Sequence, residues 1–274
     1  MYTLNCKGRL LKIQQPVVMG IINITPDSFY SGSRRFTVNS ALLTAEQMLK
    51  DGTTMLDIGG QSTRPGSKQL TEEEEMERVL PVIEAMRSRF PESFISVDTY
   101  FSSVARAAVE TGADIINDIS GGSFDASMLA TVAGLRVPYI CMHVKGTADT
   151  MHKTHAGIDI TPEVLDYFIA KKQECQEAGI VDLIIDPGFG FSKTIAQNFE
   201  ILKNLEVFSI LHKPLLLGVS RKSSIYKTLG ITPEEALNGT TVLHTAGLLK
   251  GASILRVHDV KEAVEAVKLT QYLR

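Results

Sequence analysis

The chain has 274 residues, of which 44% are hydrophobic, and its formal net charge is −3 at pH 7. This length fits one α/β barrel or one doubly wound domain better than two small domains. The charge balance gives no global basic field, so we expect no nucleic-acid partner and only a local anion site. The three cysteines have no C-x-x-C spacing, which argues against a zinc site or a disulfide framework. Without a secretory leader or an apolar run of about 18 residues, we expect a cytoplasmic protein with no membrane partner.

Eight short apolar runs are the main secondary-structure signal. Most are continuous rather than alternating, which favours parallel strands covered on both faces. They span residues 17–24, 55–60, 94–99, 115–120, 138–143, 183–187, 215–220 and 252–258.

Helical patterns lie between these runs. Residues 38–51 place apolar side chains on one face, and Gly52 follows as a stop. Thr71 and Glu74 form a capping box at the start of the next helix, in which Pro81 is expected to kink or interrupt the chain.

Two later helices have a threonine followed by proline at their expected starts. Thr161 and Thr232 are therefore predicted N-caps, and Glu235 completes a second capping box. A helix from about 234 to 250 and a last helical pattern over 260–273 complete the series.

Strands that alternate with helices, eight of each, predict a (β/α)8 barrel formed by a single domain over residues 1–274. A doubly wound sheet is the alternative, but the G-x-G-x-x-G turn that usually follows its first strand does not occur. Residues 1–16, with a turn at Lys7 and Gly8, predict a short N-terminal hairpin on the floor of the barrel.

Polar clusters follow the apolar runs, and in a barrel all of them meet at one rim, where barrel enzymes work. Arg256 and His258 lie on one face of the last strand, and two such donors suit an anion, most naturally a phosphate. The clusters occupy residues 23–29, 57–66, 96–99, 116–122, 142–143, 186–191, 218–223 and 256–259.

These clusters resemble those of the dihydropteroate synthase family, in order, from Asn23 to Asp259. The most specific are N-x-T-P-D-S-F, S-T-R-P-G, D-P-G-F-G-F, S-R-K-S and R-V-H-D. The resemblance implies a (β/α)8 barrel that joins p-aminobenzoate to 7,8-dihydropterin-6-methyl diphosphate, releasing diphosphate and forming dihydropteroate for folate synthesis. It also implies Mg²⁺ as the cofactor and a homodimer.

The pterin is expected to bind inside the barrel mouth. Carboxylates can accept the N–H groups along one pterin edge, and an amide can both donate and accept. The expected residues are Asp98, Asn117, Asp186 and Lys222, with Met142 and Ile119 against the ring face. For Asp57 and Asp118, substrate contact and support of neighbouring loops remain equally open.

The diphosphate is expected against Arg256 and His258. Asn23 is the expected Mg²⁺ ligand, with the substrate's own phosphate oxygens completing the coordination. Arg64, beside Thr63, is expected to close over the diphosphate.

The implied reaction is a dissociative substitution, in which diphosphate leaves before the amine of p-aminobenzoate attacks. Asp98 is expected to stabilise the pterin cation, and the cationic groups are expected to neutralise the leaving group. The expected catalytic residues are Arg64, Asp98, Lys222, Arg256 and His258.

The p-aminobenzoate pocket is expected to have walls from Phe29, Thr63, Pro65 and Phe191. Ser223 and the following helix N-terminus are expected to bind the carboxylate. Sulfonamides, which mimic this ring, should compete there.

Four departures from the family pattern occur, at Gln61, at Tyr30 to Ser33, at Lys145 and at Ser192. None removes a charged group assigned to catalysis. Two other hypotheses remain: a pterin-dependent methyltransferase-type barrel, which needs no diphosphate cluster, and a pterin-binding paralogue without catalysis.

Overall fold

The computed structural model describes residues 1–24, 34–61, 69–151, 153 and 159–273. Eight parallel strands form one sheet in the order β8-β7-β6-β5-β4-β3-β10-β9. A parallel bridge between Ile185 and Leu215 joins β8 to the segment before β9 and closes the ring, which confirms the predicted (β/α)8 barrel. The strands are β3 (Val17–Asn23), β4 (Met55–Gly59), β5 (Phe94–Asp98), β6 (Ile115–Asp118), β7 (Tyr139–Met142), β8 (Leu183–Asp186), β9 (Leu216–Leu217) and β10 (Ile254–Val257).

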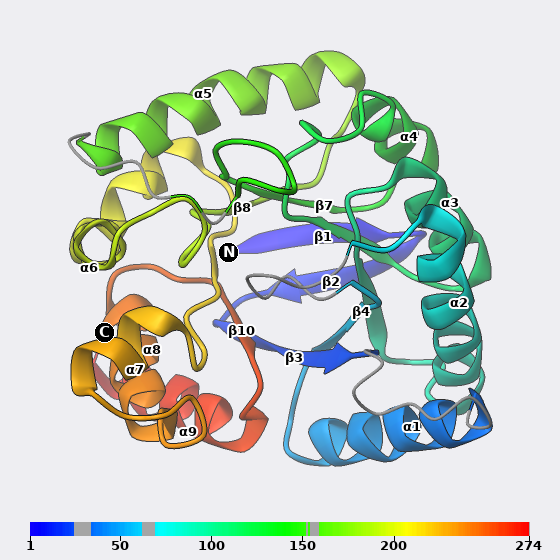
Figure 1. Cartoon of the computed structure of the whole chain (residues 1–274), viewed down its shortest axis with the longest axis horizontal. Helices are drawn as coiled ribbons and strands as arrows, with labels where there is room; N and C mark the ends of the chain where they lie inside the picture. Colours follow the sequence, from blue (N-terminus) through cyan, green and yellow to red (C-terminus); the bar gives the residue numbers. More distant parts are fainter. Residues whose placement is uncertain (25–33, 62–68, 152, 154–158, 274) are drawn as a thin grey trace.

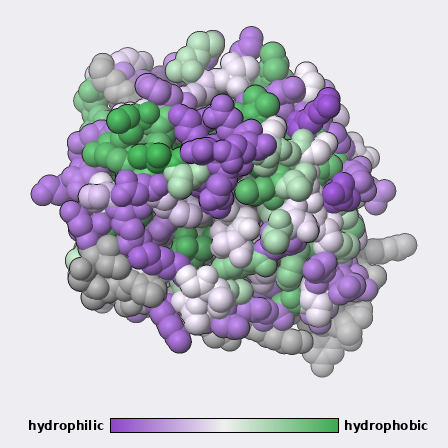
Figure 2. Space-filling model, turned by 90° about the horizontal axis from the view of Figure 1, so that it is seen from above, coloured by the Kyte–Doolittle hydropathy of each residue, from purple (hydrophilic) through white to green (hydrophobic). Residues whose placement is uncertain are grey.

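Helices surround the strands on the outside of the molecule (Figure 1). They are α1 (Arg34–Lys50), α2 (Glu72–Arg89), α3 (Ser102–Thr111), α4 (Met128–Leu135), α5 (Ile160–Ala178), α6 (Ile195–Lys203), α7 (Ser223–Leu229), α8 (Leu237–Leu249) and α9 (Val260–Thr270). Among the helices that the structure describes, none is both long enough and apolar enough to cross a membrane. On the face viewed from above α5, hydrophilic residues surround several hydrophobic patches, the broadest of which lies toward the upper left (Figure 2).

An antiparallel hairpin, β1 (Tyr2–Cys6) and β2 (Arg9–Ile13), lies across the ring of strands in Figure 1. Lys7 and Gly8 form its turn with positive φ angles, as the sequence predicted. The apolar face of the hairpin packs against residues near the starts of the barrel strands, and so closes the amino-terminal end of the barrel. The packed residues are Leu4, Cys6, Leu11 and Ile13 from the hairpin, with Met19, Met55, Ile115, Ile140, Ile184, Leu216 and Ile254.

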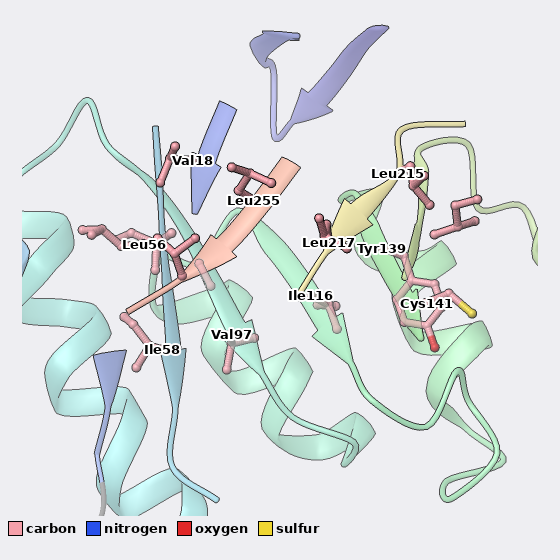
Figure 3. Close-up of a cluster of buried hydrophobic side chains, with 14 of the residues drawn as sticks. Val18, Leu56, Ile58, Val97, Ile116, Tyr139, Cys141, Leu215, Leu217 and Leu255 are labelled. Atoms are coloured by element: carbon pink, nitrogen blue, oxygen red, sulfur yellow. The ribbon is translucent and has the colours of Figure 1, made fainter. Parts of the chain in front are cut away.

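The alternation of side chains along each strand separates the helix-packed core from the barrel interior. On β4, Leu56 and Ile58 belong to the large core under the helices, which Figure 3 shows in close-up. Met55 and Asp57 have the opposite orientation. A polar residue near a strand end therefore points into the barrel mouth when it lies an even number of positions from an inward-facing apolar residue of the same strand.

The start of α2 confirms the predicted capping box. Thr71 Oγ1 accepts from the Glu74 amide, and the Glu74 carboxylate accepts from the Thr71 amide. Of the two outcomes expected at Pro81, an interruption is wrong, because α2 runs through it, and a kink stays a prediction. Pro81 lies on the exposed side of the helix, where water can satisfy the carbonyl that loses its partner, while Val82 and Ile83 stay packed.

The other two predicted N-caps are also wrong. Helix α5 begins at Ile160 with Asp159 as its N-cap, so Thr161 lies inside the first turn, where its hydroxyl approaches Glu200. Thr232 donates to the Glu235 carboxylate, but this segment forms a separate turn, and α8 begins at Leu237. In both cases the helix starts at a different residue because tertiary contacts, rather than the threonine-proline pair, position the chain.

Candidate active site

The predicted pterin residues occupy neighbouring positions on adjacent strands. Asp98 on β5 is the register partner of Asn117 on β6, and Met142 on β7 is the partner of Asp186 on β8. All four lie at or next to the ends of their strands and share the inward parity. The register therefore lines one side of the barrel mouth with two acids, one amide and one thioether.

Arg256 binds two of the carboxylates that enter the mouth. Its Nε donates to Asp57 Oδ2 at 2.6 Å, and its Nη2 donates to Asp98 Oδ2 at 2.5 Å. Asp57 is fully buried. Burial alone would lower the pKa of Arg256, but the two adjacent carboxylates outweigh it and raise that pKa. The guanidinium is thus a permanent cation that links β10 to β4 and β5.

Asp98 has a pKa well above that of an ordinary aspartate. Burial is the main cause, the charges of Asp57, Asp118 and Asp186 add to it, and the Arg256 cation opposes it. A cation that forms beside Asp98 would lower this raised pKa and so favour the ionised carboxylate.

Asn117 is buried and donates from Nδ2 to Asp57 Oδ2 at 3.0 Å. This bond fixes the orientation of the amide. Its carbonyl oxygen and its second N–H have no partner among the described residues, and so remain as one acceptor and one donor for a planar ligand.

Asp57 and Asp118 differ in role, although the sequence left both open. Asp57 enters the mouth with Arg256 and Asn117. Asp118 faces away and accepts from the amides of Ser120 and Gly122 at 2.7 Å and from Tyr139 Oη at 2.6 Å. Asp118 therefore supports the loop after β6.

Asp186 and Lys222 are neighbouring groups of opposite charge in the mouth. Asp186 Oδ1 accepts from the Gly188 amide at 2.8 Å, and the side chain is 6% exposed. Burial raises the pKa of Asp186, while the nearby Lys222 cation and the Gly188 amide act in the other direction. Burial lowers the pKa of Lys222 to about 8, although Asp186 partly restores it.

Lys222 is held by the loop after β8. Its Nζ donates to the carbonyl of Phe189 and lies 4.7 Å from the centroid of the Phe191 ring. Phe191 belongs in turn to a small apolar cluster at the carboxyl end of the barrel. That cluster comprises Tyr100, Ile119, Met142, Met151 and Phe191, and so includes both apolar residues expected against the pterin ring.

His258 follows the last residue of β10, and its imidazole Nδ1 lies 3.0 Å from Ser220 Oγ. The same oxygen accepts the His258 backbone N–H at 3.2 Å. If the hydroxyl hydrogen points at Nδ1, the proton of a neutral imidazole lies on Nε2. Loss of solvent around the ring and the charge of Arg256 lower the pKa of His258, so it is a neutral donor near pH 7.

Two further predicted residues lie at element ends. Ser223 is the first residue of α7 and is partly exposed. Asn23 is the last residue of β3, on the inward parity, and is exposed. Arg64, Thr63, Pro65 and Phe29 lie outside the described residues, so their expected roles stay predictions.

Sequence reasoning gave no role to Ser220 or to Lys193. Ser220 stands in the S-R-K-S run, where its contact with a histidine 38 residues later is invisible. Lys193 is 4% exposed, yet it follows Phe191 and Ser192 in a segment that reads as a polar loop. The proline-glycine turn at Pro187 and Gly188 signals a tight loop, but not that a lysine fills it.

Comparisons with known proteins agree with this geometry. The model of the family described as pterin binding enzyme matches residues 19–258. The dihydropteroate synthase of Escherichia coli K12 is 42% identical over 267 residues, covering 97% of this chain and 94% of that protein.

Solved structures agree as well. A Xanthomonas albilineans dihydropteroate synthase with 4-aminobenzoic acid superimposes with a TM-score of 0.91, at 40% identity over 99% of this chain and 97% of that chain. A Yersinia pestis dihydropteroate synthase in a sulfonamide drug complex gives a TM-score of 0.92, at 37% identity over 100% and 99% of the two chains. The chain belongs to the pterin-binding enzyme family, among the dihydropteroate synthases.

Proposed function

We propose that this chain condenses 7,8-dihydropterin-6-methyl diphosphate with p-aminobenzoate to give 7,8-dihydropteroate and diphosphate, as a transferase of folate synthesis. The observation that carries the proposal is the position of Arg256, held between Asp57 and Asp98 in the barrel mouth. It joins the strand that ends in the R-V-H-D run to the acids expected at the pterin.

The pterin edge is bound by complementary donors and acceptors. Asp186 accepts ring N–H groups, Asn117 offers one acceptor and one donor, and Lys222 donates to the ring carbonyl. Met142 and Ile119 cover one face of the ring. The support is that these side chains converge from four strand ends on one mouth with little remaining solvent exposure.

Departure of diphosphate is assisted by positive charge and by directed N–H groups. His258 donates from Nε2 to a phosphate oxygen, and Arg256 supplies a charge that does not titrate near pH 7. Arg64 is proposed to add a third donor from the loop after β4.

Mg²⁺ is the proposed cofactor. Asn23 is exposed at the carboxyl end of β3, so its amide oxygen suits a hard cation. No group of three or more His, Cys, Asp or Glu side chains within the described residues forms a metal site, so phosphate oxygens and water would complete the coordination. The ion would neutralise charge that develops on the leaving diphosphate.

Asp98 is the proposed stabiliser of the pterin cation left behind. It is already held by Arg256, and its raised pKa reflects a carboxylate that gains stability when positive charge forms nearby. The amine of p-aminobenzoate then attacks the exocyclic carbon and loses a proton to solvent or to a neighbouring base. Phe191 is proposed to contact its ring and Ser223 its carboxylate, with Phe29, Thr63 and Pro65 as the remaining walls.

A coupled assay tests the proposal. Purified protein is mixed with the pterin diphosphate, Mg²⁺ and labelled p-aminobenzoate, and both labelled dihydropteroate and free diphosphate are measured. Equimolar appearance of the two products supports the reaction. Pterin binding without product would instead establish the binding paralogue that catalyses nothing.

The homodimer is also a proposal. Helix α8 carries Leu248 in the core, but its Val242 and Leu249 are exposed. Burial of such residues against a second copy would stabilise an association. Light scattering after size-exclusion chromatography distinguishes a mass near 60 kDa, about twice the 30.0 kDa of the chain, from a monomer.

A further inference from the structure

Lys193 is a buried ammonium that binds three backbone carbonyls. Its Nζ donates to Gly188 O at 3.0 Å, Phe191 O at 3.1 Å and His143 O at 3.3 Å. Within the described part of the chain it forms no ion pair with a carboxylate, and the residue is only 4% exposed. A buried cation without a paired anion is costly, so such a group usually serves more than packing.

The three carbonyls belong to the loops that end β7 and β8. His143 directly follows Met142, while Gly188 and Phe191 bound the turn after Asp186. The fit is tight: a side chain at Gly188 would approach the His143 carbonyl oxygen to 2.0 Å and Lys193 Nζ to 3.2 Å. Lys193 therefore fastens the two loops to each other.

The fastened turn carries three contacts of the proposed pterin site. The Gly188 amide donates to Asp186 Oδ1, the Phe189 carbonyl accepts from Lys222, and the Phe191 ring lies beside the Lys222 ammonium. A change in the turn would displace all of them together.

Charge is the second connection. Lys193 is one of the cations that favour the ionised form of Asp186, and Asp186 favours the charged form of Lys193 in return. The other groups that face the pair from surrounding elements are Lys222, Arg256, Asp98, Glu163, Lys145, Gly188 N–H and the neutral imidazole of His143.

We propose that Lys193 is a positioning residue for pterin binding, which shapes the Gly188–Phe191 turn and keeps Asp186 ionised to accept the ring N–H groups. It acts from behind the site, through Asp186 and Lys222, and does not touch the substrate. This role rests on the proposed function.

The test measures the affinity of a 7,8-dihydropterin without the diphosphate, so that no phosphate titrates, between about pH 4 and pH 8. Burial lowers the pKa of Lys193 to about 7, so its ammonium is charged over the acid part of this range. Lys193→Met keeps the length of the side chain and removes the charge. Without the charge of Lys193, Asp186 becomes ionised only at a higher pH. The acid limb, which is the pH range where pterin affinity falls on acidification, should therefore move up by about one pH unit. On the acid side of that limb, this shift corresponds to about a tenfold loss of pterin affinity.

Asn198→Ala is the matched control. Asn198 is buried and its Oδ1 accepts from the Gly190 amide at 2.7 Å, so this change loosens the same turn without removing a charge. It should weaken pterin affinity by a similar factor at every pH and leave the acid limb in place. Thermal melting of each variant shows that both are folded.

An acid limb that stays in place in Lys193→Met, as in Asn198→Ala, would overturn the proposal and reduce Lys193 to a packing role. If Lys193→Met does not fold, Lys193→Gln, which keeps an N–H donor but no charge, gives the same comparison. Failure of the unchanged protein to bind the pterin at any pH would overturn the proposed function, and this proposal with it.

Discussion

The guanidinium of Arg256 donates to the carboxylate of Asp98 at 2.5 Å and joins residues that are 158 positions apart in the chain. The contact crosses the barrel mouth, from β10 to β5. It couples the strand end expected at the diphosphate to the acid expected at the pterin. When diphosphate leaves the pterin, positive charge on the pterin and negative charge on the leaving group therefore develop beside the ion pair of Arg256 and Asp98.

Asp98→Asn should lower kcat with little loss of stability. The amide keeps the shape but not the negative charge that stabilises the pterin cation. By analogy with the loss of one charge-stabilising contact, kcat should fall by about 10²–10³-fold. Steady-state kinetics beside thermal melting separates this result from simple unfolding, and an unchanged kcat would remove Asp98 from the mechanism.

Asp118→Asn should have the opposite effect. Its carboxylate accepts two amides and the Tyr139 hydroxyl behind the strands, and the substituted amide cannot accept all of them. We expect a stability loss of about 1–3 kcal/mol in urea unfolding. The kcat of the folded fraction should stay close to that of the unchanged protein, and a fall as large as in Asp98→Asn would contradict the division of roles.

The pH dependence of kcat/KM should show an acid limb well above the ordinary aspartate pKa of about 4. Asp98 has a raised pKa, so it is protonated over a range in which an exposed aspartate is ionised. The ionised form is the active one, and activity therefore falls as the pH decreases through that pKa. Kinetics in overlapping buffers checks this limb, and a flat profile down to about pH 4 would argue against an essential Asp98 carboxylate.

Ser220→Ala should allow the neutral imidazole of His258 to adopt either tautomer. Without the hydroxyl, Nδ1 loses its donor, and the proton is no longer confined to Nε2. We expect a mixed tautomer in nitrogen NMR spectra of the imidazole and a loss of kcat of about fivefold to tenfold, the size of one hydrogen bond. Ser224→Ala is the control, because that serine is equally buried and its hydroxyl has no partner within the described residues. Spectra that stay unchanged in Ser220→Ala would remove the assignment.

Asn23→Ala should raise the Mg²⁺ concentration needed for half-maximal rate by about tenfold, since one of the few protein oxygens is lost. Chelation of Mg²⁺ by EDTA should abolish turnover in both proteins. If the two proteins have the same Mg²⁺ dependence, the ion is bound elsewhere.

Much of this fold was predictable because its signals are local. Continuous apolar runs gave all eight strands to within a few residues, and Lys7 and Gly8 gave the hairpin turn. The wrong N-caps at Thr161 and Thr232 show the limit of such signals, because a threonine before proline also suits a first turn or a separate turn.

The residues that lie at the strand ends were predictable, but the contacts that they make with one another were not. Asn117 and Asp118 are neighbours, so one must face inward and one outward, and only the register decides which. The burial of Lys193 depends on two loops that meet around it, 50 residues apart in sequence. No local pattern carries that information.

The most direct test of the account compares product formation by the unchanged protein, Arg256→Ala and Arg87→Ala. Arg87 also binds a buried aspartate, Asp114, but at the opposite end of the barrel. We predict dihydropteroate from the unchanged protein and from folded Arg87→Ala, and at least a hundredfold loss of kcat/KM in folded Arg256→Ala. Product formation by Arg256→Ala at the rate of Arg87→Ala would contradict the central role of the Arg256 cluster.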